Sequence, residues 1–273
     1  MAKAPTADRW RIAEGARLDL KKIDTSSTAG APGDKEETRK ATDELRVELE
    51  ELQNRLYAES KQSLLVVLQA MDTGGKDGTI RKVFSGVNPQ GVKVHSFKAP
   101  TEEELAHDFL WRAHAFAPRD GDIMIFNRSH YEDVLIVRVH DLAPKKVWQA
   151  RYGHIQAFER LLADDGTKVL KVFLHISEDE QKARLQARVD TPDKHWKFNP
   201  ADLEERKRWA DYQHAYRDAI AKTSTAAAPW FVVPADRKWY RDWAVLTVIV
   251  EALRAMKPSY PPALADIAGT VVE

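Results

Sequence analysis

The chain has 273 residues, 43% of them hydrophobic, so it can bury a full core as one large domain or as a domain with a lid. Lys plus Arg equals Asp plus Glu at 42 each, so bulk charge gives no argument for nucleic acid binding, and any polyanion site requires local segregation of charge. No cysteine is present, which excludes a disulfide framework and a thiolate metal site. The start, MAKAPTADRWRIAEG, lacks the apolar core of a secretory signal, and no apolar run approaches a membrane span; we expect a soluble cytoplasmic protein that binds neither membrane nor nucleic acid.

The first 60 residues predict an arm followed by a helix. Residues 1–36 mix small residues, proline and charge, which indicates an extended arm rather than a domain. From about residue 37 to 60, one apolar stripe predicts a helix packed on the domain; its members are Leu45, Leu49, Leu52 and Leu56.

Short apolar runs alternate with helical patterns along the rest of the chain. The strands are predicted at 63–70, 91–97, 122–126, 168–176 and 229–235, and the helices at 76–86, 102–117, 130–139, 144–164, 177–189, 201–222 and 236–257. This alternation predicts βαβ units and a parallel sheet covered by helices on both faces. The main domain is predicted to cover 37–257, with a C-terminal tail at 258–273.

The first predicted strand runs directly into AMDTGGKDGTI, residues 70–80. Gly74 and Gly75 allow the backbone to wrap closely, and Lys76 adds a mobile positive charge at a helix start, where backbone N–H groups bind anions. The stretch departs from the usual phosphate loop, because Ala70 replaces its first glycine and Asp77 replaces its metal-binding Ser/Thr. An ordinary glycine-rich turn is the alternative.

Asp72 lies inside this loop, four residues before Lys76. A carboxylate on the phosphate face ligates a hard cation directly, so the loop can carry its own acid. The carboxylate of Asp77, at the helix start, has the simpler role of complementing the helix dipole.

The stretch IFNRSHYEDVL, residues 125–135, follows the strand predicted at 122–126. Asn127 stands where P-loop enzymes carry an acid, and Arg128 is a candidate for binding a transferred phosphoryl group. A structural arginine at the sheet edge is the alternative. Glu132 and Asp133 follow, and their alternative role is to complement the helix dipole as carboxylates at a helix start.

The stretch QKARLQARVDTPDKHWKFNP, residues 181–200, is locally basic and interrupted by proline. Arg184 and Arg188 share one helix face, and Lys194, Trp196 and Lys197 form a basic-aromatic tip. This pattern predicts a lid over phosphates at about 182–208; a solvated charged helix is the alternative.

Together, MDTGGKDGT, FNRSHYEDVL and TPDKHWK resemble the type-2 polyphosphate kinases, over about residues 35 to 257. PTEEELAHDFLWRAH, residues 100–114, and FLHISEDEQ, residues 173–181, add to the likeness. The resemblance implies a P-loop kinase fold similar to thymidylate kinase: an α/β protein, specifically a three-layer α/β/α sandwich with a parallel five-stranded sheet and a helical lid. It also implies phosphoryl transfer between polyphosphate and nucleotides, with Mg²⁺ or Mn²⁺.

The resemblance assigns roles residue by residue. Catalysis falls on Asp72, Lys76, Arg128 and Arg188, and polyphosphate binding on Lys76, Arg184, Lys194 and Lys197. Phosphate and nucleotide contacts fall on Gly74, Gly75, Gly78, Thr79, Arg112, Asn127, Glu132 and Asp133. Because Asn127 replaces the family's second acid, Asp72 remains the main metal ligand, with Asp133 or water completing the shell. The HYEDV form resembles the subgroup that accepts both nucleoside mono- and diphosphates.

Two other classes compete with this interpretation. An NTP-dependent nucleotide kinase on the same fold normally keeps the Ser/Thr after the loop lysine, and Asp77 speaks against it. A non-catalytic polyphosphate- or RNA-binding module would not need Asp72 beside a cation. Long surface helices favour a homo-oligomer.

Overall fold

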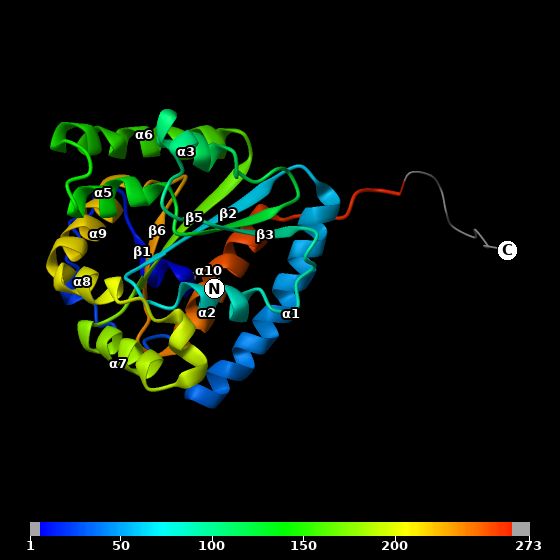
Figure 1. Cartoon of the computed structure of the whole chain (residues 1–273). Coiled ribbons are helices and arrows are strands. Elements are labelled where there is room, and N and C mark those ends of the chain that lie inside the picture. Colours follow the sequence, from blue (N-terminus) through cyan, green and yellow to red (C-terminus); the bar gives the residue numbers. More distant parts are fainter. Residues whose placement is uncertain (1–5, 264–273) are drawn as a thin grey trace.

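The computed structural model describes residues 6–263, and at its centre lies a six-stranded sheet in the order β1-β6-β5-β2-β4-β3 (Figure 1). The strands are β1 (Arg11–Ile12), β2 (Ser63–Ala70), β3 (Val92–Ser96), β4 (Ile123–Asn127), β5 (Thr167–His175) and β6 (Trp230–Pro234). The neighbouring pairs β3–β4, β4–β2, β2–β5 and β5–β6 are all parallel. Every residue of β2 is buried, as a strand covered on both faces requires. The predicted α/β fold is confirmed.

The sheet has one strand more than predicted, because the N-terminal arm supplies β1. Arg11 and Ile12 pair antiparallel with Phe231 and Trp230 of β6. The preceding Trp10 is buried and packs edge-on against Trp243, with ring centroids 5.5 Å apart. This anchor holds the arm at the sheet edge, and a strand of two residues is too short to show a periodic pattern in the sequence.

Helices cover both faces of the sheet. They are α1 (Lys35–Glu59), α2 (Lys76–Val83), α3 (Glu102–Ala106), α4 (Trp111–His114), α5 (Ile136–Val139), α6 (Lys145–Asp164), α7 (Glu178–Val189), α8 (Ala201–Lys207), α9 (Trp209–Thr223) and α10 (Lys238–Met256), with the 3-10 helices η1 (Thr6–Trp10), η2 (Leu20–Lys22), η3 (His130–Val134) and η4 (Pro192–Lys197). One layer contains α1, α2 and α10, and the other contains α5, α6 and α9 (Figure 1).

Three predicted helices are divided in the structure. The segment 102–117 splits into α3 and α4, because the Asp108 side chain accepts from Leu110 N (2.9 Å) and makes a local turn. The segment 130–139 splits into η3 and α5 at Leu135, whose backbone leaves the helical region (φ −105°, ψ −90°). The segment 201–222 breaks at Arg208, whose backbone leaves the helical region (φ −94°, ψ 19°). Side-chain caps and single-residue breaks of this kind interrupt a helix without disturbing its apolar periodicity.

Both ends of the chain extend past the described residues. Residues 1–5 of the predicted arm and 264–273 of the predicted tail are outside them, and 258–263 form neither helix nor strand. None of the helices within 6–263 is long and apolar enough to cross a membrane.

Candidate functional site

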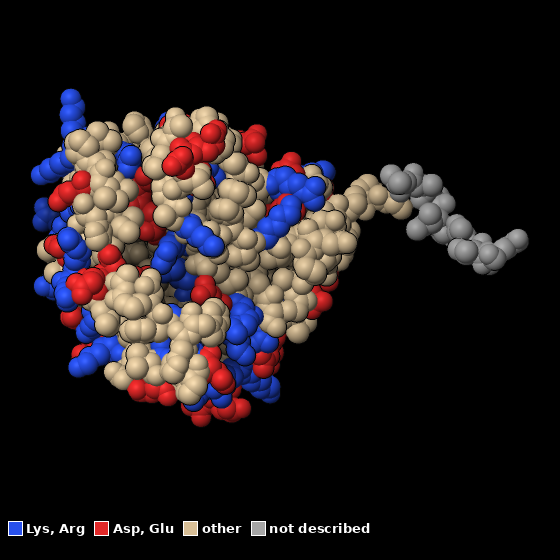
Figure 2. Space-filling model, in the orientation of Figure 1, with Lys and Arg blue, Asp and Glu red and all other residues tan. Residues whose placement is uncertain are grey.

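A cleft of about 1600 Å³ opens where the parallel strands β2, β3 and β4 end. Thirteen Lys and Arg residues and six Asp and Glu residues line it, an excess of seven positive charges in a chain whose totals are equal. Figure 2 shows basic side chains around the hollow on this face of the molecule. The charge segregation that a polyanion site requires is therefore present.

The glycine-rich loop after β2 lines this cleft. Thr73 and Gly75 adopt positive φ angles of 60° and 102°. A Cβ atom on Gly74 would lie 2.5 Å from Ala70 Cβ and 2.7 Å from Met71 O, so only glycine fits there. The next helix, α2, has no side-chain cap, and the amides of residues 76–78 donate no hydrogen bond within the described chain. Uncapped amides at a helix N-terminus, with its dipole, form an anion site.

Lys76 is the first residue of α2, and its side chain extends back to the end of β2. Its Nζ donates to Ala70 O at 3.1 Å. Burial and the nearby Arg128 lower the pKa of Lys76, while Asp72 and Glu132 oppose this shift. The ammonium thus lies near a second cation, Arg128, and near the carboxylates of Asp72 and Glu132.

Asp72 and Arg128 form an ion pair across the ends of two neighbouring strands. Arg128 Nη2 lies 3.0 Å from Asp72 Oδ1, and both side chains line the cleft. Arg128 has a positive φ of 60°, which is uncommon for a residue with a side chain and occurs at functional sites. Burial lowers its pKa, but the carboxylates of Glu132 and Asp72 raise it overall. The alternative role for Arg128, capping the sheet edge, does not match this pairing into the cleft.

The two acids that follow in η3 lie on different sides. Glu132 interacts electrostatically with Arg128, Lys76 and Asp72, and burial raises its pKa despite the two cations. Asp133 points elsewhere: its oxygens lie 3.0 Å from Arg151 and 4.0 Å from Arg112, and it is not among the cleft-lining residues.

The expected partnership of Asp133 with Asp72 at a cation therefore needs correction. In a 3-10 helix consecutive side chains are separated by about 120°, so Glu132 and Asp133 cannot face the same site. Asp133 neutralises the buried Arg112 and the half-buried Arg151, and Glu132 is the acid of this pair that lies with the loop residues.

The two positions that depart from the usual motifs contact each other. Asn127 Nδ2 donates to Asp77 Oδ1 at 2.7 Å and lies 3.4 Å from Ser96 Oγ. Both Asn127 and Asp77 line the cleft. The Asn127 amide thus stands where a strand-end acid was expected, and the Asp77 carboxylate stands at the helix start, where a hydroxyl was expected.

Four predicted phosphate or nucleotide contacts do not line the cleft: Glu132 and Asp133, described above, and also Thr79 and Arg112. Thr79 is fully buried, because it lies on the inner face of α2. Arg112 is buried too: its Nη1 donates to Lys98 O at 2.9 Å, and its guanidinium lies 5.3 Å from the Phe97 ring centroid. Since Phe97 and Lys98 line the cleft, Arg112 supports the wall from behind.

The segment predicted as a lid contributes residues to the cleft from α7, η4 and α8. Arg188 Nη1 donates to Asp202 Oδ2 (3.1 Å) and to Lys197 O (3.0 Å), which ties the lid to itself. Lys194 and Lys197 are exposed at the tip, and Lys197 Nζ lies 4.8 Å from the ring of Trp196. All five of these side chains line the cleft. That this segment acts as a lid stays a prediction.

Arg184 does line the cleft, but its donors are occupied. Its guanidinium donates to five oxygens: Glu180 Oε1 and the carbonyls of Thr73, Gly74, Ala235 and Asp236. A guanidinium has five N–H groups, so none remains for a phosphate. The predicted polyphosphate contact of Arg184 is corrected to a contact with the protein's own loop.

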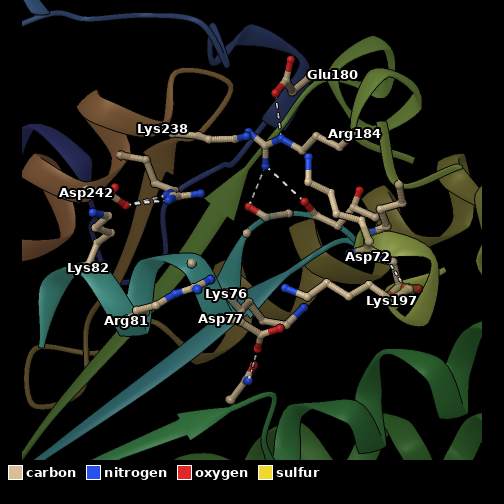
Figure 3. A pocket seen from close by; sticks show the side chains of 18 of the residues that line it. Asp72, Lys76, Asp77, Arg81, Lys82, Glu180, Arg184, Lys197, Lys238 and Asp242 are labelled. Atoms are coloured by element: carbon tan, nitrogen blue, oxygen red, sulfur yellow. Dashed lines mark hydrogen bonds and ion pairs between the residues drawn. The ribbon is translucent and has the colours of Figure 1, made fainter. Parts of the chain in front are cut away.

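Sequence reasoning missed a basic wall on the side of α1, α2 and α10 (Figure 3). The basic wall consists of Arg39, Arg46, Arg81, Lys82, Lys238 and Arg241. Arg39 and Arg46 are seven residues apart, hence on one helix face, which was an available signal. Arg241 gave none: it is 3% exposed, and a Cβ on Gly75 would lie 2.2 Å from its Nη1.

The donor set fits one divalent cation held mostly by substrate. Within the described residues no group of three or more His, Cys, Asp or Glu side chains forms a metal cage. Asp72 presents a carboxylate to the cleft, and its Oδ1 is paired with Arg128. Mg²⁺ commonly binds through one or two carboxylates, substrate phosphates and water, which this arrangement matches.

Comparisons with known proteins agree with this geometry. The polyphosphate kinase 2 family model matches residues 33–261. An AMP/ADP-polyphosphate phosphotransferase of Meiothermus ruber is 55% identical over 253 residues, which are 93% of this chain and 95% of the relative. An ADP-polyphosphate phosphotransferase of Rhodopseudomonas palustris is 44% identical, over 93% and 91%. The crystal structure of polyphosphate kinase 2 from Arthrobacter aurescens superimposes with a TM-score of 0.93 at 45% identity, covering 98% of this chain and 95% of that one.

Proposed function

The chain belongs to the polyphosphate kinase 2 family, and we propose that it transfers a phosphoryl group reversibly between inorganic polyphosphate and nucleoside mono- and diphosphates, AMP and ADP among them. The observation that carries this proposal is the phosphate loop: free amides at the start of α2 and Lys76, inside a cleft with an excess of seven positive charges. The proposal that both mono- and diphosphates are accepted rests on the HYEDV segment and on the name of the Meiothermus relative.

Charge stabilisation and alignment are what the site supplies. Phosphoryl transfer spreads negative charge over the equatorial oxygens and needs little covalent help. The loop amides and Lys76 hold one phosphate, and Arg128 meets the charge that develops in the transition state. Arg188 adds a third cation when the lid lies over the site. A terminal phosphate of a nucleotide is already ionised near neutral pH, so no strong general base is required.

The polyphosphate chain is assigned to the basic wall and the lid tip. The exposed residues of the basic wall (Arg39, Arg81, Lys82 and Lys238), with Lys194 and Lys197 of the predicted lid, line the same cleft as Lys76 and form a group of positive charges. A repeating anion gains from such a group, because each phosphate meets a cation. The cleft on the other side of the loop, with Phe97 and Asn127, has fewer cations and an aromatic ring, and it suits the nucleoside.

Asp72 is the residue assigned to hold a divalent cation, Mg²⁺ or Mn²⁺, together with substrate phosphates and water. When bound, the cation neutralises phosphate charge. Asp72 itself orients Arg128 through their 3.0 Å contact, so the carboxylate serves both groups.

The experiment is incubation of ADP or AMP with polyphosphate and Mg²⁺, with production of ATP or ADP as readout. A parallel incubation with ATP as the phosphate donor to AMP distinguishes an NTP-dependent kinase. Lys76→Ala should lower the polyphosphate-dependent rate by about 10²–10³, from the loss of roughly 3–4 kcal/mol of transition-state stabilisation. Turnover with ATP alone, no turnover with either donor, or a Lys76→Ala variant as active as the parent would reject the proposal. The cytoplasmic location and the homo-oligomer stay predictions.

A further inference from the structure

Three consecutive carbonyl groups of the phosphate loop accept hydrogen bonds from two side chains of α7. Gln181 Nε2 donates to Asp72 O at 3.0 Å. Arg184 Nη1 donates to Thr73 O at 3.2 Å and to Gly74 O at 3.0 Å (Figure 3). Gln181 is 1% exposed, so its amide is available to nothing outside the protein.

These hydrogen bonds fix the direction of the loop amides. In a planar peptide the C=O and the following N–H point in opposite directions. When Arg184 holds Gly74 O, the N–H of Gly75 is turned away from α7, on the side of the free amides of residues 76–78. None of the amides of 75–78 donates a hydrogen bond within residues 6–263. Successive N–H groups held on one side form an anion nest.

The loop backbone needs this support. Thr73, a β-branched residue, has a φ of 60°, a region that L side chains rarely adopt. Asp72, Thr73 and Gly74 are the three residues whose carbonyls are held. A strained segment persists only where its surroundings over-determine it, and here two side chains of a neighbouring helix do so.

A second row of hydrogen bonds continues to the N-terminal arm. Arg184 Nη2 donates to Ala235 O (2.6 Å) and Asp236 O (3.3 Å), just after β6. Asp236 is held in turn by Thr25: Thr25 Oγ1 donates to Asp236 Oδ2 at 2.6 Å, and Asp236 N donates to Thr25 O at 3.1 Å. Thr25 lies outside the residues that the family model matches, yet only Asp236 and Arg184 separate it from the loop.

We propose that Gln181 and Arg184 are positioning residues that keep the N–H groups of the phosphate loop turned into the cleft, and that Thr25 of the arm, through Asp236, belongs to the same support. The inference rests on the proposed function, because it assigns the loop as the phosphate site. It gives the arm a role in the reaction rather than in stability alone. Its distinguishing feature is that Gln181 and Thr25 are uncharged, so neither acts by attracting polyphosphate.

The test uses the full chain with two substitutions and their matched controls. Gln181→Met removes the contact with Asp72 O at similar volume, and Gln186→Met on the exposed side of the same helix is its control. Thr25→Val removes the hydroxyl contact, Thr25→Ser restores it, and Thr28→Val is the control, since the Thr28 hydroxyl makes no hydrogen bond in the described chain. The measurements are kcat and KM with polyphosphate and ADP, the salt dependence of KM, and hydrogen exchange of the loop amides.

Misplaced transition-state groups lower kcat more than they weaken binding, and a misplacement of 1 Å is worth up to about 10²-fold. We expect kcat to fall about tenfold in Gln181→Met and about threefold in Thr25→Val, with faster exchange of the 72–78 amides. KM for polyphosphate and its salt dependence should stay near parental values, and Thr25→Ser and both controls should behave as the parent. Parental kcat in either Gln181→Met or Thr25→Val, or a change confined to KM, overturns the inference. If Lys76→Ala is inactive while these variants keep parental kcat, only this inference fails; if Lys76→Ala is active, the proposed function fails.

Discussion

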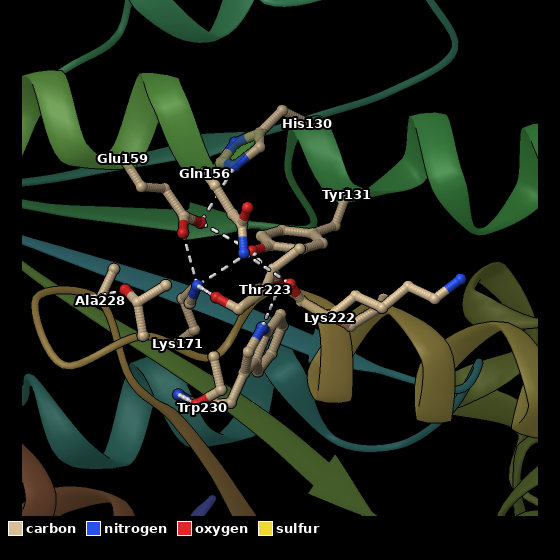
Figure 4. A network of polar contacts seen from close by, with 12 residues as sticks. His130, Tyr131, Gln156, Glu159, Lys171, Lys222, Thr223, Ala228 and Trp230 are labelled. Atoms are coloured by element: carbon tan, nitrogen blue, oxygen red, sulfur yellow. Dashed lines mark hydrogen bonds and ion pairs between the residues drawn. The ribbon is translucent and has the colours of Figure 1, made fainter. Parts of the chain in front are cut away.

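Replacing Lys171 by methionine should destabilise the protein strongly, because this lysine is wholly buried in the middle of β5. Its Nζ donates to Glu159 Oε2, to Thr223 O at 2.7 Å and to Tyr131 Oη at 3.1 Å (Figure 4). Burial by itself raises the pKa of Glu159, but the Lys171 ammonium lowers it overall, so the carboxylate is charged at neutral pH. Lys171→Met would leave that charge buried with only neutral donors and His130 beside it.

The magnitude follows from the hydrogen bonds and the ion pair that the substitution removes. A hydrogen bond to a charged group contributes about 1.5–3 kcal/mol and a neutral one about 0.5–1.5 kcal/mol, and stranding one charge of a buried pair costs about 3–5 kcal/mol. We therefore expect Lys171→Met to lower the free energy of unfolding by about 3–5 kcal/mol. Glu159→Leu should have a similar effect, because it strands the ammonium. The double variant should lose clearly less than the two single losses together, by at least about 1 kcal/mol, since it buries no unpaired charge.

Urea unfolding followed by circular dichroism measures these differences as shifts in the midpoint at an unchanged slope. Lys207→Met is the matched control: Lys207 pairs with Glu204 at 2.7 Å, but both side chains are about 70% exposed, and its loss should stay within roughly 0.5 kcal/mol. A loss below about 1 kcal/mol in Lys171→Met, or strictly additive losses in the double variant, would refute the reasoning. Tyr131, which accepts from Lys171, directly precedes Glu132 in η3, so a folded Lys171→Met variant should also show a lower kcat.

Asp133→Asn should lower the free energy of unfolding by about 1–3 kcal/mol, because Asp133 pairs with Arg151 and Arg112 rather than with the loop. For the same reason it should reduce kcat/KM for AMP and for ADP alike, and a selective loss of AMP phosphorylation would contradict that placement. Neutralising Lys194 and Lys197 together should raise KM for polyphosphate and weaken its salt dependence while leaving the nucleotide KM nearly unchanged, and a selective rise in the nucleotide KM would count against the lid tip as the polyphosphate contact. Burial raises the folded-state pKa of Glu132 above its ordinary value, so this group's contribution to stability is present at low pH and lost as pH rises through the folded pKa. E132Q should therefore gain stability relative to the parent as pH rises from acid to neutral, in urea titrations at several pH values; a parallel pH dependence in both proteins would show that Glu132 does not titrate differently on folding.

The sequence by itself determined the order of strands and helices and the place of the phosphate loop. Both follow from local rules: apolar runs mark the buried strands, and Gly74, Gly75 and Lys76 stand between a strand and a helix, where the backbone alone creates an anion site. The basic tip at the cleft was predictable in the same way, since Lys194 and Lys197 follow closely after Pro192, where a helix ends.

Only the tertiary structure decided what individual charged side chains contact. Arg184 and Arg188 look equivalent in the sequence, four residues apart on one helix face, yet Arg184 has all five donors on protein oxygens. Glu132 and Asp133 were likewise separated by the 3-10 geometry of η3, which turns neighbouring side chains to different sides.

The basic wall shows the same limit over a longer range. Arg46 and Arg241 lie almost two hundred residues apart in the chain and line the same cleft because α1 and α10 pack side by side on one face of the sheet. The arm is the clearest instance: its mixed composition predicts no element, and β1 forms because burial of Trp10 against α10 brings two residues to the edge of β6. Local sequence specifies backbone conformation, whereas the partner of a long charged side chain depends on which distant segments the folded core brings within a few ångströms of it.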